Sequence, residues 1–352
     1  MAELKIAGID VFQVDLPYSG GVCHLSGGRT YTSFDGTIVR ITTQNGLEVR
    51  AGIAEIAPHL NGLDPRNVDR INDAMDAALL GNETAKAAID VACWDVLGKS
   101  VGLPVCQLLG GSTGDKLPLL LSVPVANAED TRQLVADVRA KGYTGFSVKI
   151  GQDPESDAER IKACLADKKR GEYFTIDANS GLTVETALRT SRLLPEGLDF
   201  VLEAPCATWR ETMSLRRRTT IPFLIDELLL NEAAAANIVA SDVGEAINLK
   251  VSKVGGLTRC RRIRDICLAS GITISVQETC GLDIAFAAII HLSQTIPSRM
   301  LRPILHSSEM VIPKTADCDF EIHEGFVEAL KTPGLGVTPR LDVLGEPVAT
   351  YQ

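Results

Sequence analysis

One regularity constrains the fold of this chain more than any other: from residue 117 onward, short β-rich runs alternate with amphipathic helical stretches. The β-rich runs span residues 117–123, 145–150, 173–177, 199–203, 222–226, 246–250 and 272–276, with a weaker eighth near 300–304. Their ends recur roughly every 25 residues, the length of one strand–loop–helix–loop unit. Seven or eight such units in series predict an α/β fold with a parallel (β/α)7β barrel of the TIM type, rather than a doubly wound sheet.

The chain before the first repeat has a different pattern. Residues 5–16 and 35–43 alternate apolar and polar side chains, which predicts antiparallel strands, and helical periodicity follows over 67–80 and 84–98. The end of the chain is rich in loops. We therefore expect an N-terminal α+β capping domain at 1–115, a catalytic barrel at 116–320, and a C-terminal tail at 321–352 that packs back on the capping domain.

An ionisable residue closes each of five successive predicted strands of the barrel. In chain order these residues are Lys149, Asp177, Glu203, Asp226 and Lys250. The carboxyl ends of barrel strands form the rim where active sites are built, so the five side chains should converge there. One charged strand end would mean little, because strands often exit into polar loops. Five in register are much harder to explain as solvated surface.

The three carboxylates on neighbouring strands predict a metal site. Asp177, Glu203 and Asp226 would repel one another at one rim unless a cation lay between them. Ligands that are all oxygen favour a hard ion such as Mg²⁺, which predicts one Mg²⁺ per subunit. Asn179, two residues past Asp177, could add a polar contact at this site or cap the loop; the sequence leaves both open.

The two lysines predict proton transfer on both faces of a substrate. Lys149 and Lys250 close the second and sixth strands, so they lie across an eight-stranded barrel from each other. Burial and a nearby cation would both lower the pKa of a lysine toward the range of a general base. This layout predicts abstraction of a proton next to a carboxylate, with positive charge stabilising the enediolate. An alternative of another class is a catalytically silent barrel that only binds a carboxylated metabolite.

Weaker candidates surround this set. Gln277 and Glu278 close the seventh strand and could contact substrate or a lysine, and Cys280 follows them. Lys253 is predicted to be structural, because on a continuing strand it would point away from Lys250. His291 lies in an apolar helical stretch and is predicted to be a core residue. The five histidines show no metal-ligand spacing, and no nucleotide-binding glycine motif is present.

Composition excludes several kinds of partner. The net charge of −10 leaves nothing to neutralise phosphates, which argues against nucleic acid. Nine cysteines without paired spacing indicate reduced thiols rather than a disulfide framework. The first residues lack a signal-peptide pattern, and no apolar run is long enough for a membrane helix. We expect a soluble cytoplasmic protein that binds a small carboxylate substrate.

These motifs resemble the mandelate racemase/muconate lactonizing enzyme group of the enolase superfamily. The matching segments are 85–95, 98–99 and 108–111 at the end of the capping domain, and 148–151, 176–179, 202–205, 225–227 and 248–256 in the barrel. The resemblance implies that Asp177, Glu203 and Asp226 bind Mg²⁺, as is known for this superfamily. It also implies that Lys149 and Lys250 are paired acid/base residues, and that the protein is a homo-oligomer.

Within this group the chain is most similar to the branch of cis-3-hydroxy-L-proline dehydratases and hydroxyproline betaine epimerases. In cis-3-hydroxy-L-proline the hydroxyl group lies opposite the α-hydrogen, so loss of water is an anti elimination. Two lysines on opposite faces suit this reaction, which would give Δ1-pyrroline-2-carboxylate. The same lysines could instead remove and return the α-proton, as a 2-epimerase or racemase of a proline betaine or other amino-acid derivative would. The residues alone leave this alternative open.

Three departures from the group bear on the substrate. Residues 147–149 read Ser-Val-Lys where relatives often have Lys-x-Lys, so one charge that would lower the lysine pKa is absent. Cys280 stands where relatives often carry an aromatic residue, which disfavours a quaternary ammonium substrate. Residues 46–52 run almost directly into a helix, where relatives insert a lid loop around 48–50. Either the chain lacks this lid or the sequence omits it; an open site would admit water, which favours omission.

Overall fold

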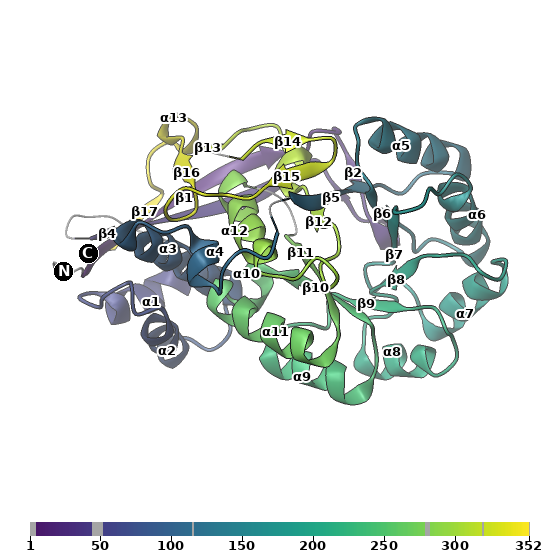
Figure 1. Ribbon diagram of the computed structural model, residues 1–352, viewed down its shortest axis with the longest axis horizontal. Helices are drawn as coiled ribbons and strands as arrows, with labels where there is room; N and C mark the ends of the chain where they lie inside the picture. Colours follow the sequence, from purple (N-terminus) through teal and green to yellow (C-terminus); the bar gives the residue numbers. More distant parts are fainter. Residues whose placement is uncertain (1–4, 44–51, 115, 279–281, 319, 352) are drawn as a thin grey trace.

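The computed structural model describes residues 5–43, 52–114, 116–278, 282–318 and 320–351. It contains a large barrel and a smaller α+β unit beside it (Figure 1). The fold class predicted from the strand–helix repeat is confirmed. Two predicted features, Cys280 and the segment at 48–50, lie outside the described residues.

The smaller unit contains an antiparallel sheet and a group of helices. The sheet has the order β17–β1–β4, with β1 (Ile6–Pro17) in the centre between β4 (Ser33–Thr43) and β17 (Ala349–Tyr351). Four helices follow: α1 (Gly52–Leu60), α2 (Val68–Ala78), α3 (Glu83–Val101) and α4 (Val105–Leu108). A short ribbon of β2 (Cys23–His24) and β3 (Thr30–Tyr31), with the 3-10 turn η1 (Ser26–Gly28) between them, extends toward the barrel.

Eight parallel strands form the barrel. They are β5 (Lys116–Val123), β6 (Gly145–Lys149), β7 (Tyr173–Asp177), β8 (Val201–Glu203), β9 (Phe223–Ile225), β10 (Ala246–Lys250), β11 (Thr273–Gln277) and β12 (Ile304–Leu305). Pairing runs in chain order from β5 to β11. The ring closes because Ile304 pairs with Leu119 on β5 and Leu301 bridges to Ile274 on β11.

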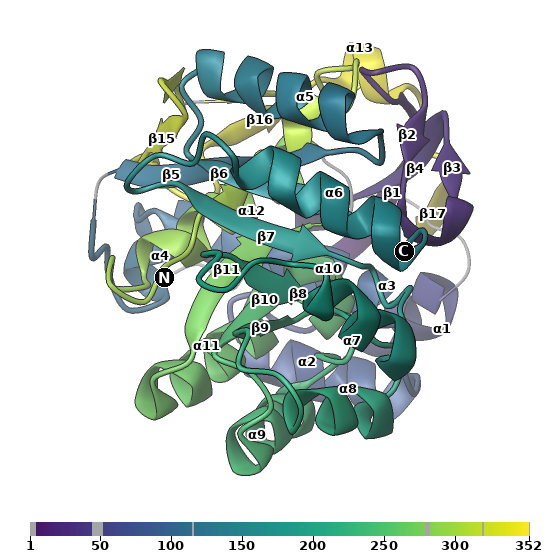
Figure 2. The ribbon, with the colours of Figure 1, turned by 90° about the vertical axis from the view of Figure 1, so that its right-hand side faces the viewer.

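A helix follows each of the first seven barrel strands and covers its outer face (Figure 2). These helices are α5 (Ala128–Ala140), α6 (Pro154–Leu165), α7 (Val184–Arg192), α8 (Trp209–Arg216), α9 (Glu232–Ser241), α11 (Leu257–Ser270), which is preceded by the short α10 (Val251–Val254), and α12 (Asp283–Gln294). Five of them begin at a residue whose side chain accepts a hydrogen bond from the first turn: Asn127, Asp153, Thr183, Thr208 and Asn231. Such caps define where each strand–helix loop ends.

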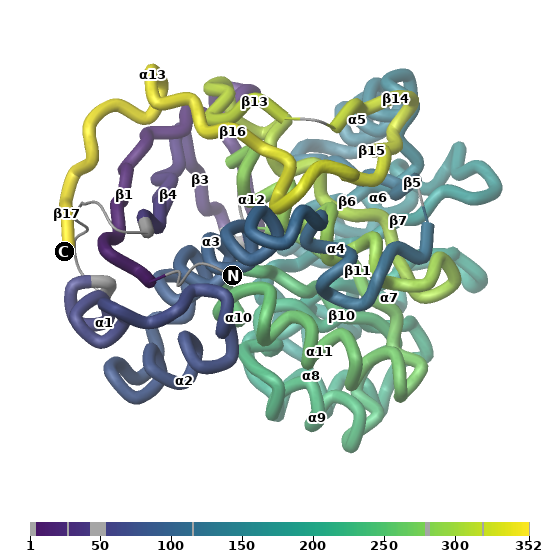
Figure 3. Tube along the Cα trace, turned by 60° about the vertical axis from the view of Figure 1, so that its left-hand side comes forward, coloured from purple at the N-terminus to yellow at the C-terminus, as the bar shows by residue number. Residues whose placement is uncertain are grey.

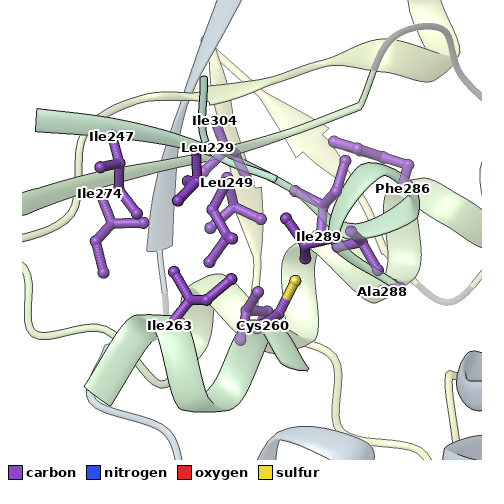
Figure 4. Close-up of a cluster of buried hydrophobic side chains, with 14 of the residues drawn as sticks. Leu229, Ile247, Leu249, Cys260, Ile263, Ile274, Phe286, Ala288, Ile289 and Ile304 are labelled. Carbon is purple, nitrogen blue, oxygen red and sulfur yellow. The ribbon is translucent and has the colours of Figure 1, made fainter. Parts of the chain in front are cut away.

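Apolar side chains from strands and helices form one continuous core. Figure 4 shows part of it, where Leu249 of β10 and Ile274 of β11 lie against Cys260 and Ile263 of α11. Burying each such aliphatic side chain stabilises the fold by about 1.5–3 kcal/mol. The described cysteines are all free, and most are buried in this way as small apolar residues. Among the described residues, no helix is long and apolar enough to cross a membrane.

A buried carboxylate joins the two units. Asp90 of α3 is fully buried and accepts hydrogen bonds from the backbone amide of Thr258 (3.0 Å), from its hydroxyl group, and from Asn72 Nδ2 (2.6 Å). Trp94, one turn further along α3, donates from Nε1 to Thr258 Oγ1 at 2.9 Å. Helix α3 is thereby fixed on the first turn of α11.

The C-terminal part of the chain divides between the two units (Figure 3). After η2 (Ser307–Met310) and β13 (Ala316–Cys318), the hairpin of β14 (Ile322–His323) and β15 (Phe326–Glu328) pairs with the start of β5, whereas β17 pairs with β1. Between them lie β16 (Val337–Pro339), which pairs with β13, and α13 (Leu341–Leu344).

The tail expected at 321–352 therefore begins on the barrel rather than on the capping domain. Strand β5 extends beyond its pairing with β6, and the hairpin covers the backbone groups left at that edge. We propose that the capping domain ends at residue 115 and that the barrel ends at residue 320.

Candidate functional site

The five strand-end residues lie on adjacent strands at one rim of the barrel. Lys149 is directly opposite Asp177 in the pairing of β6 with β7, and Asp177 is opposite Glu203 in the pairing of β7 with β8. Asp226 follows β9, and Lys250 ends β10. The three carboxylates are at most 1% exposed, whereas the two lysine side chains keep 13% and 15% exposure. The structure thus brings the predicted set together, with buried acids and more accessible bases.

Each lysine is paired with an aspartate. Lys149 Nζ contacts Asp177 Oδ2, and Lys250 Nζ lies 2.6 Å from Asp226 Oδ2. Burial disfavours the charged form of both lysines, but the surrounding carboxylates outweigh burial, so the pKa of each lysine is raised above its ordinary value. The lowered lysine pKa expected from the sequence is not found. That expectation placed a cation near the lysines and left out the aspartates in direct contact with them.

Lys253 is a third lysine of the site, and its predicted orientation was wrong. Its Nζ donates to the backbone oxygen of Asp226 at 2.7 Å and also contacts the Asp226 carboxylate. The chain turns from β10 into helix α10 directly after Lys250, so the alternation of side chains along a strand ends there. Burial alone would raise the pKa of Asp226, but Lys250 and Lys253 together lower it to about 2.

Glu203 is the least satisfied of the three acids. Burial and the nearby Asp177 raise its pKa to about 8, even though Lys149 acts in the opposite direction. Asn248 Nδ2 donates to Glu203 Oε1 at 2.9 Å and to Asp226 Oδ2 at 3.2 Å, a bridging role that the sequence reading missed. Glu203 Oε2 is buried and has no hydrogen-bond partner among the described residues. An unpaired carboxylate oxygen between two other acids is the arrangement that a cation would relieve.

The three acids provide the oxygen ligands that a hard cation prefers, but lysine ammonium groups contact two of these acids in the structure. In the described part of the chain, no group of three His, Cys, Asp or Glu side chains stands ready to hold a metal ion. Ammonium groups contact oxygens of Asp177 and Asp226 in this arrangement. The assignment of the three acids as metal ligands stays a prediction.

Asn179 lies at this site and links it to the capping domain. Its backbone amide and Nδ2 donate to the two oxygens of Asp177 at 2.7 and 2.9 Å, and Nδ2 also lies 3.4 Å from Glu227 Oε1. From the capping domain, Ser26 Oγ donates to Asn179 Oδ1 at 3.4 Å, and Arg29 donates to its backbone oxygen at 3.2 Å. The amide side chain therefore holds Asp177 in place, as well as shaping its own loop.

Glu227 is a fourth acid that the sequence reading did not assign. It follows Asp226 directly, and burial together with Asp226 and Asp177 raises its pKa. The strand-end pattern predicts one inward-facing residue per strand and therefore selects Asp226 but not Glu227, because neighbours in sequence point in different directions at a strand end. The motif 225–227 contained the only signal that could have found it.

The remaining candidates have supporting positions. Gln277 is buried and donates to Ser275 Oγ at 3.0 Å, and Glu278 accepts from the backbone and the hydroxyl group of Ser252 at 2.8 and 2.5 Å. Glu278 thus anchors α10, the helix that carries Lys253. His291 is fully buried, which confirms its assignment to the core, and burial lowers its pKa to about 4.

Comparison with known families matches both units of the fold. Residues 11–110 match the N-terminal domain model of mandelate racemase/muconate lactonizing enzymes, and residues 130–343 match the enolase C-terminal domain-like model. The chain belongs to the mandelate racemase/muconate lactonizing enzyme group of the enolase superfamily. It is therefore an enzyme, which sets aside the silent binding barrel.

Individual relatives cover the chain almost completely. A cis-3-hydroxy-L-proline dehydratase from Roseibium aggregatum is 40% identical over 99% of this chain and 100% of its own length. An N-succinyl-L-Arg/Lys racemase from Bacillus cereus is 27% identical over 97% of this chain and 98% of its own. A solved structure of a group member from Roseovarius nubinhibens ISM, complexed with magnesium, has a TM-score of 0.95 and 44% identity over 99% of this chain and 100% of that chain.

Proposed function

We propose that this enzyme is a Mg²⁺-dependent dehydratase that converts cis-3-hydroxy-L-proline to Δ1-pyrroline-2-carboxylate. The observation that carries the proposal is the placement of Lys149 on β6 and Lys250 on β10, four strands apart around the barrel, with the buried acids between them. Two proton-transfer groups on opposite sides of a substrate are what an anti elimination requires. The dehydratase relative at 40% identity supports the choice of substrate.

Asp177, Glu203 and Asp226 would hold the metal ion. When bound, the ion would supply positive charge that stabilises an enediolate formed from the substrate carboxylate. The charge balance supports this assignment: with Glu227, four carboxylates face the three ammonium groups of Lys149, Lys250 and Lys253. If all are ionised, the site carries one net negative charge, and a divalent ion would change this to one net positive charge, which favours binding of a substrate carboxylate.

The lysines would carry out the chemistry in two linked proton transfers. One lysine, in its neutral form, takes the α-proton, and the electron pair of the C–H bond moves toward the carboxylate to give the enediolate. That electron pair then forms the new C=C bond as the hydroxyl group leaves. The C–O bond to the hydroxyl group breaks on the opposite face, where the second lysine, in its protonated form, donates the proton that completes the leaving water. The enamine product then tautomerises. A lysine in contact with an aspartate is held in its protonated form, so at least one lysine–aspartate contact would have to break when the site is loaded with metal and substrate.

A turnover screen tests the substrate assignment. Hydroxyproline isomers and their betaines would be supplied with Mg²⁺ and with EDTA, and the proposal expects activity on cis-3-hydroxy-L-proline that chelation abolishes. Lys149→Ala and Lys250→Ala should each lower turnover by roughly 10²–10⁴-fold. Full activity in EDTA, or full turnover in either variant, would contradict the metal or the two-base assignment respectively.

A 2-epimerase or racemase of a proline derivative is the second candidate, favoured by the same pair of lysines and by the racemase relative. Reaction in D₂O separates the two. Deuterium entering unchanged substrate without loss of water would replace the dehydratase with the epimerase. We also propose that the enzyme is a homo-oligomer, as the family resemblance implies; light scattering of the purified protein would test this.

A further inference from the structure

A small cavity lies beside the acids of the site, at the ends of β7, β8 and β9. Its volume is about 10 Å³, close to the space that one water molecule needs. Pro205, Cys206 and Ile225 form apolar parts of its wall, and Asp226 borders it from the side of the candidate metal site. The cavity thus shares Asp226 and Glu227 with the candidate metal site, and neither Lys149 nor Lys250 lines it.

Three side-chain oxygen atoms, each from a residue that lines this cavity, have no hydrogen-bond partner among the described residues. They are Ser180 Oγ, Thr212 Oγ1 and Glu227 Oε2, and all three are shielded from solvent. Thr212 as a whole is only 1% exposed. A buried polar atom without a partner costs about 1–3 kcal/mol, so three around one cavity would be a severe defect in a native fold.

The chemistry of these three atoms matches one water molecule. A carboxylate oxygen accepts hydrogen bonds, and each hydroxyl group can donate or accept. A water molecule can donate to Glu227 and exchange one hydrogen bond with each hydroxyl group, which gives the roughly three partners that buried waters usually have. We propose that the cavity is a specific binding site for a single structural water, and that this water fixes the side chain of Glu227.

The backbone around the cavity supports a positioning role. Asn179, Ser180 and Ala204 all have positive φ, at 42°, 62° and 41°, a conformation that non-glycine residues adopt only when their surroundings enforce it. The amide of Ser180 donates to the carbonyl oxygen of Ala204 at 2.8 Å, which ties the two loops together on the cavity wall. A water that bonds to Ser180, Thr212 and Glu227 would connect this strained pair of loops to α8 and to the end of β9.

The position of Glu227 affects the candidate metal site through Asn179. Nδ2 of Asn179 is shared between Glu227 Oε1 and Asp177 Oδ2, at 3.4 and 2.9 Å. Displacing Glu227 would therefore change the direction of the amide that holds Asp177. Glu227 is therefore a positioning residue, and the proposed water would hold its side chain by a hydrogen bond. The consequence for metal binding rests on the proposed function, whereas the water site itself does not.

The first experiment is a crystal structure of the full chain at a resolution that shows ordered waters, for wild type, Thr212→Val and Thr212→Ser. We expect one water in the cavity of the wild type and of Thr212→Ser, which keeps the hydroxyl group, and its loss in Thr212→Val. A cavity without density in the wild type would overturn the proposal. A monovalent cation in the cavity, recognised by shorter contacts and exchange with Rb⁺, would overturn it too.

The melting temperature gives an independent test whose sign separates the two cases. If the water is present, Thr212→Val removes one of its partners and should lower Tm by roughly 2 °C. If the cavity is dry, the same change removes an unpaired buried hydroxyl group and should raise Tm. Thr131→Val is the matched control, because Thr131 is also a buried helical threonine, but its hydroxyl group bonds directly to the Asn127 carbonyl oxygen at 2.7 Å.

The third measurement follows the positioning role. In the enzyme loaded with Mg²⁺, Thr212→Val should raise the Mg²⁺ concentration for half-maximal turnover roughly threefold, less than the 10–100-fold expected for direct partners of a metal ligand. Thr212→Ser should restore it, and Thr131→Val should leave it unchanged. Water lost from the crystal with no change in Mg²⁺ dependence would overturn the positioning role and leave the water site standing. Failure of the proposed reaction would affect only this third measurement.

Discussion

Two buried carboxylates in this molecule have opposite surroundings. Asp90, at the junction of the capping domain and the barrel, receives hydrogen bonds on both oxygens from Asn72 and Thr258. Glu203, at the barrel rim, has one oxygen bonded to Asn248 and one without a partner among the described residues. Burial raises the pKa of both acids, so burial does not distinguish them.

The difference lies in the neighbours. Asp90 is surrounded by neutral donors that complete its hydrogen bonding, which makes it part of the scaffold. Glu203 stands between Asp177 and Asp226, whose negative charges oppose its ionisation, and its Oε2 has no hydrogen-bond partner among the described residues. A buried acid with complete hydrogen bonding stabilises the fold, whereas a buried acid with an unbonded oxygen and like-charged neighbours is a candidate for binding a cation.

The largest effect should come from Glu203→Gln. The amide keeps the shape of the side chain but removes a charge that the candidate Mg²⁺ needs, so turnover should fall at least roughly 10³-fold. Stability in EDTA should be unchanged or higher, because repulsion with the two aspartates is relieved. Steady-state kinetics and thermal melts would check both effects. A variant that loses stability and keeps its turnover would place Glu203 with Asp90 in the scaffold.

Asp90→Asn should give the reverse result. The amide places a donor against the donors of Asn72 and Thr258, which should lower the free energy of unfolding by about 2 kcal/mol. Turnover per folded molecule should stay within about twofold of wild type, since Asp90 contacts none of the rim residues. Denaturant titration together with kinetics would measure this. An undiminished stability with a loss of activity would reverse the proposed roles of the two acids.

Lys253→Met tests whether the third lysine belongs to the rim. The change removes a positive partner of Asp226 while keeping most of the side-chain volume, and turnover should fall roughly 10-fold, less than for Lys250→Ala. The smaller effect is expected because Lys253 contacts Asp226 from α10 and not from a strand end. Lys168→Met is the control and should change turnover little, because Lys168 pairs with Asp199, which lies before the start of β8 and not at the strand end that carries Glu203. Equal activity in both variants would return Lys253 to a structural role.

The smallest expected effect is on the pH dependence of stability and comes from a buried base, His306. His306 Nδ1 lies 2.7 Å from the hydroxyl oxygen of Tyr143, and burial lowers its pKa to about 4. The unfolded chain takes up a proton near pH 6.5, but the folded chain does not until about pH 4. The folded state therefore becomes less stable relative to the unfolded state as pH falls from about 6.5 toward 4. The free energy of unfolding should fall by about 1 kcal/mol between pH 6.5 and 5.5.

Denaturant titrations at several pH values would measure the effect of His306. His306→Gln should flatten the dependence, whereas His59→Gln, at an exposed position, should not. An identical slope in His306→Gln and wild type would show that other groups account for the loss of stability at low pH.

The barrel and the rim could be predicted from sequence because each depends on a local pattern. Strand ends such as Asp177 and Lys250 follow from the repeat, and parallel pairing then places them side by side. Lys253 was misjudged because the strand pattern ends one residue before the short helix that carries it. Glu227 and Asn248 were missed for a related reason, since their roles depend on contacts with acids from other strands and not on their own segments.

The raised pKa of the lysines shows the same limit, because it arises from distances between side chains that no spacing along the chain records. The hairpin at β14 and β15 was also beyond the sequence reading. Its strands are too short to give an alternating pattern, and its pairing with β5 joins segments that are distant in the sequence, such as Phe326 and Pro118.

The pairing of β17 with β1 has a consequence for how the protein is made. Ala349–Tyr351 are the last described residues of the chain, and they complete the sheet that Ile6–Pro17 begins. During synthesis, β1 therefore leaves the ribosome long before its partner exists, and one edge of that sheet stays open while the whole barrel is being translated. The sheet of the capping domain is thus begun before the barrel is synthesised and completed only after it.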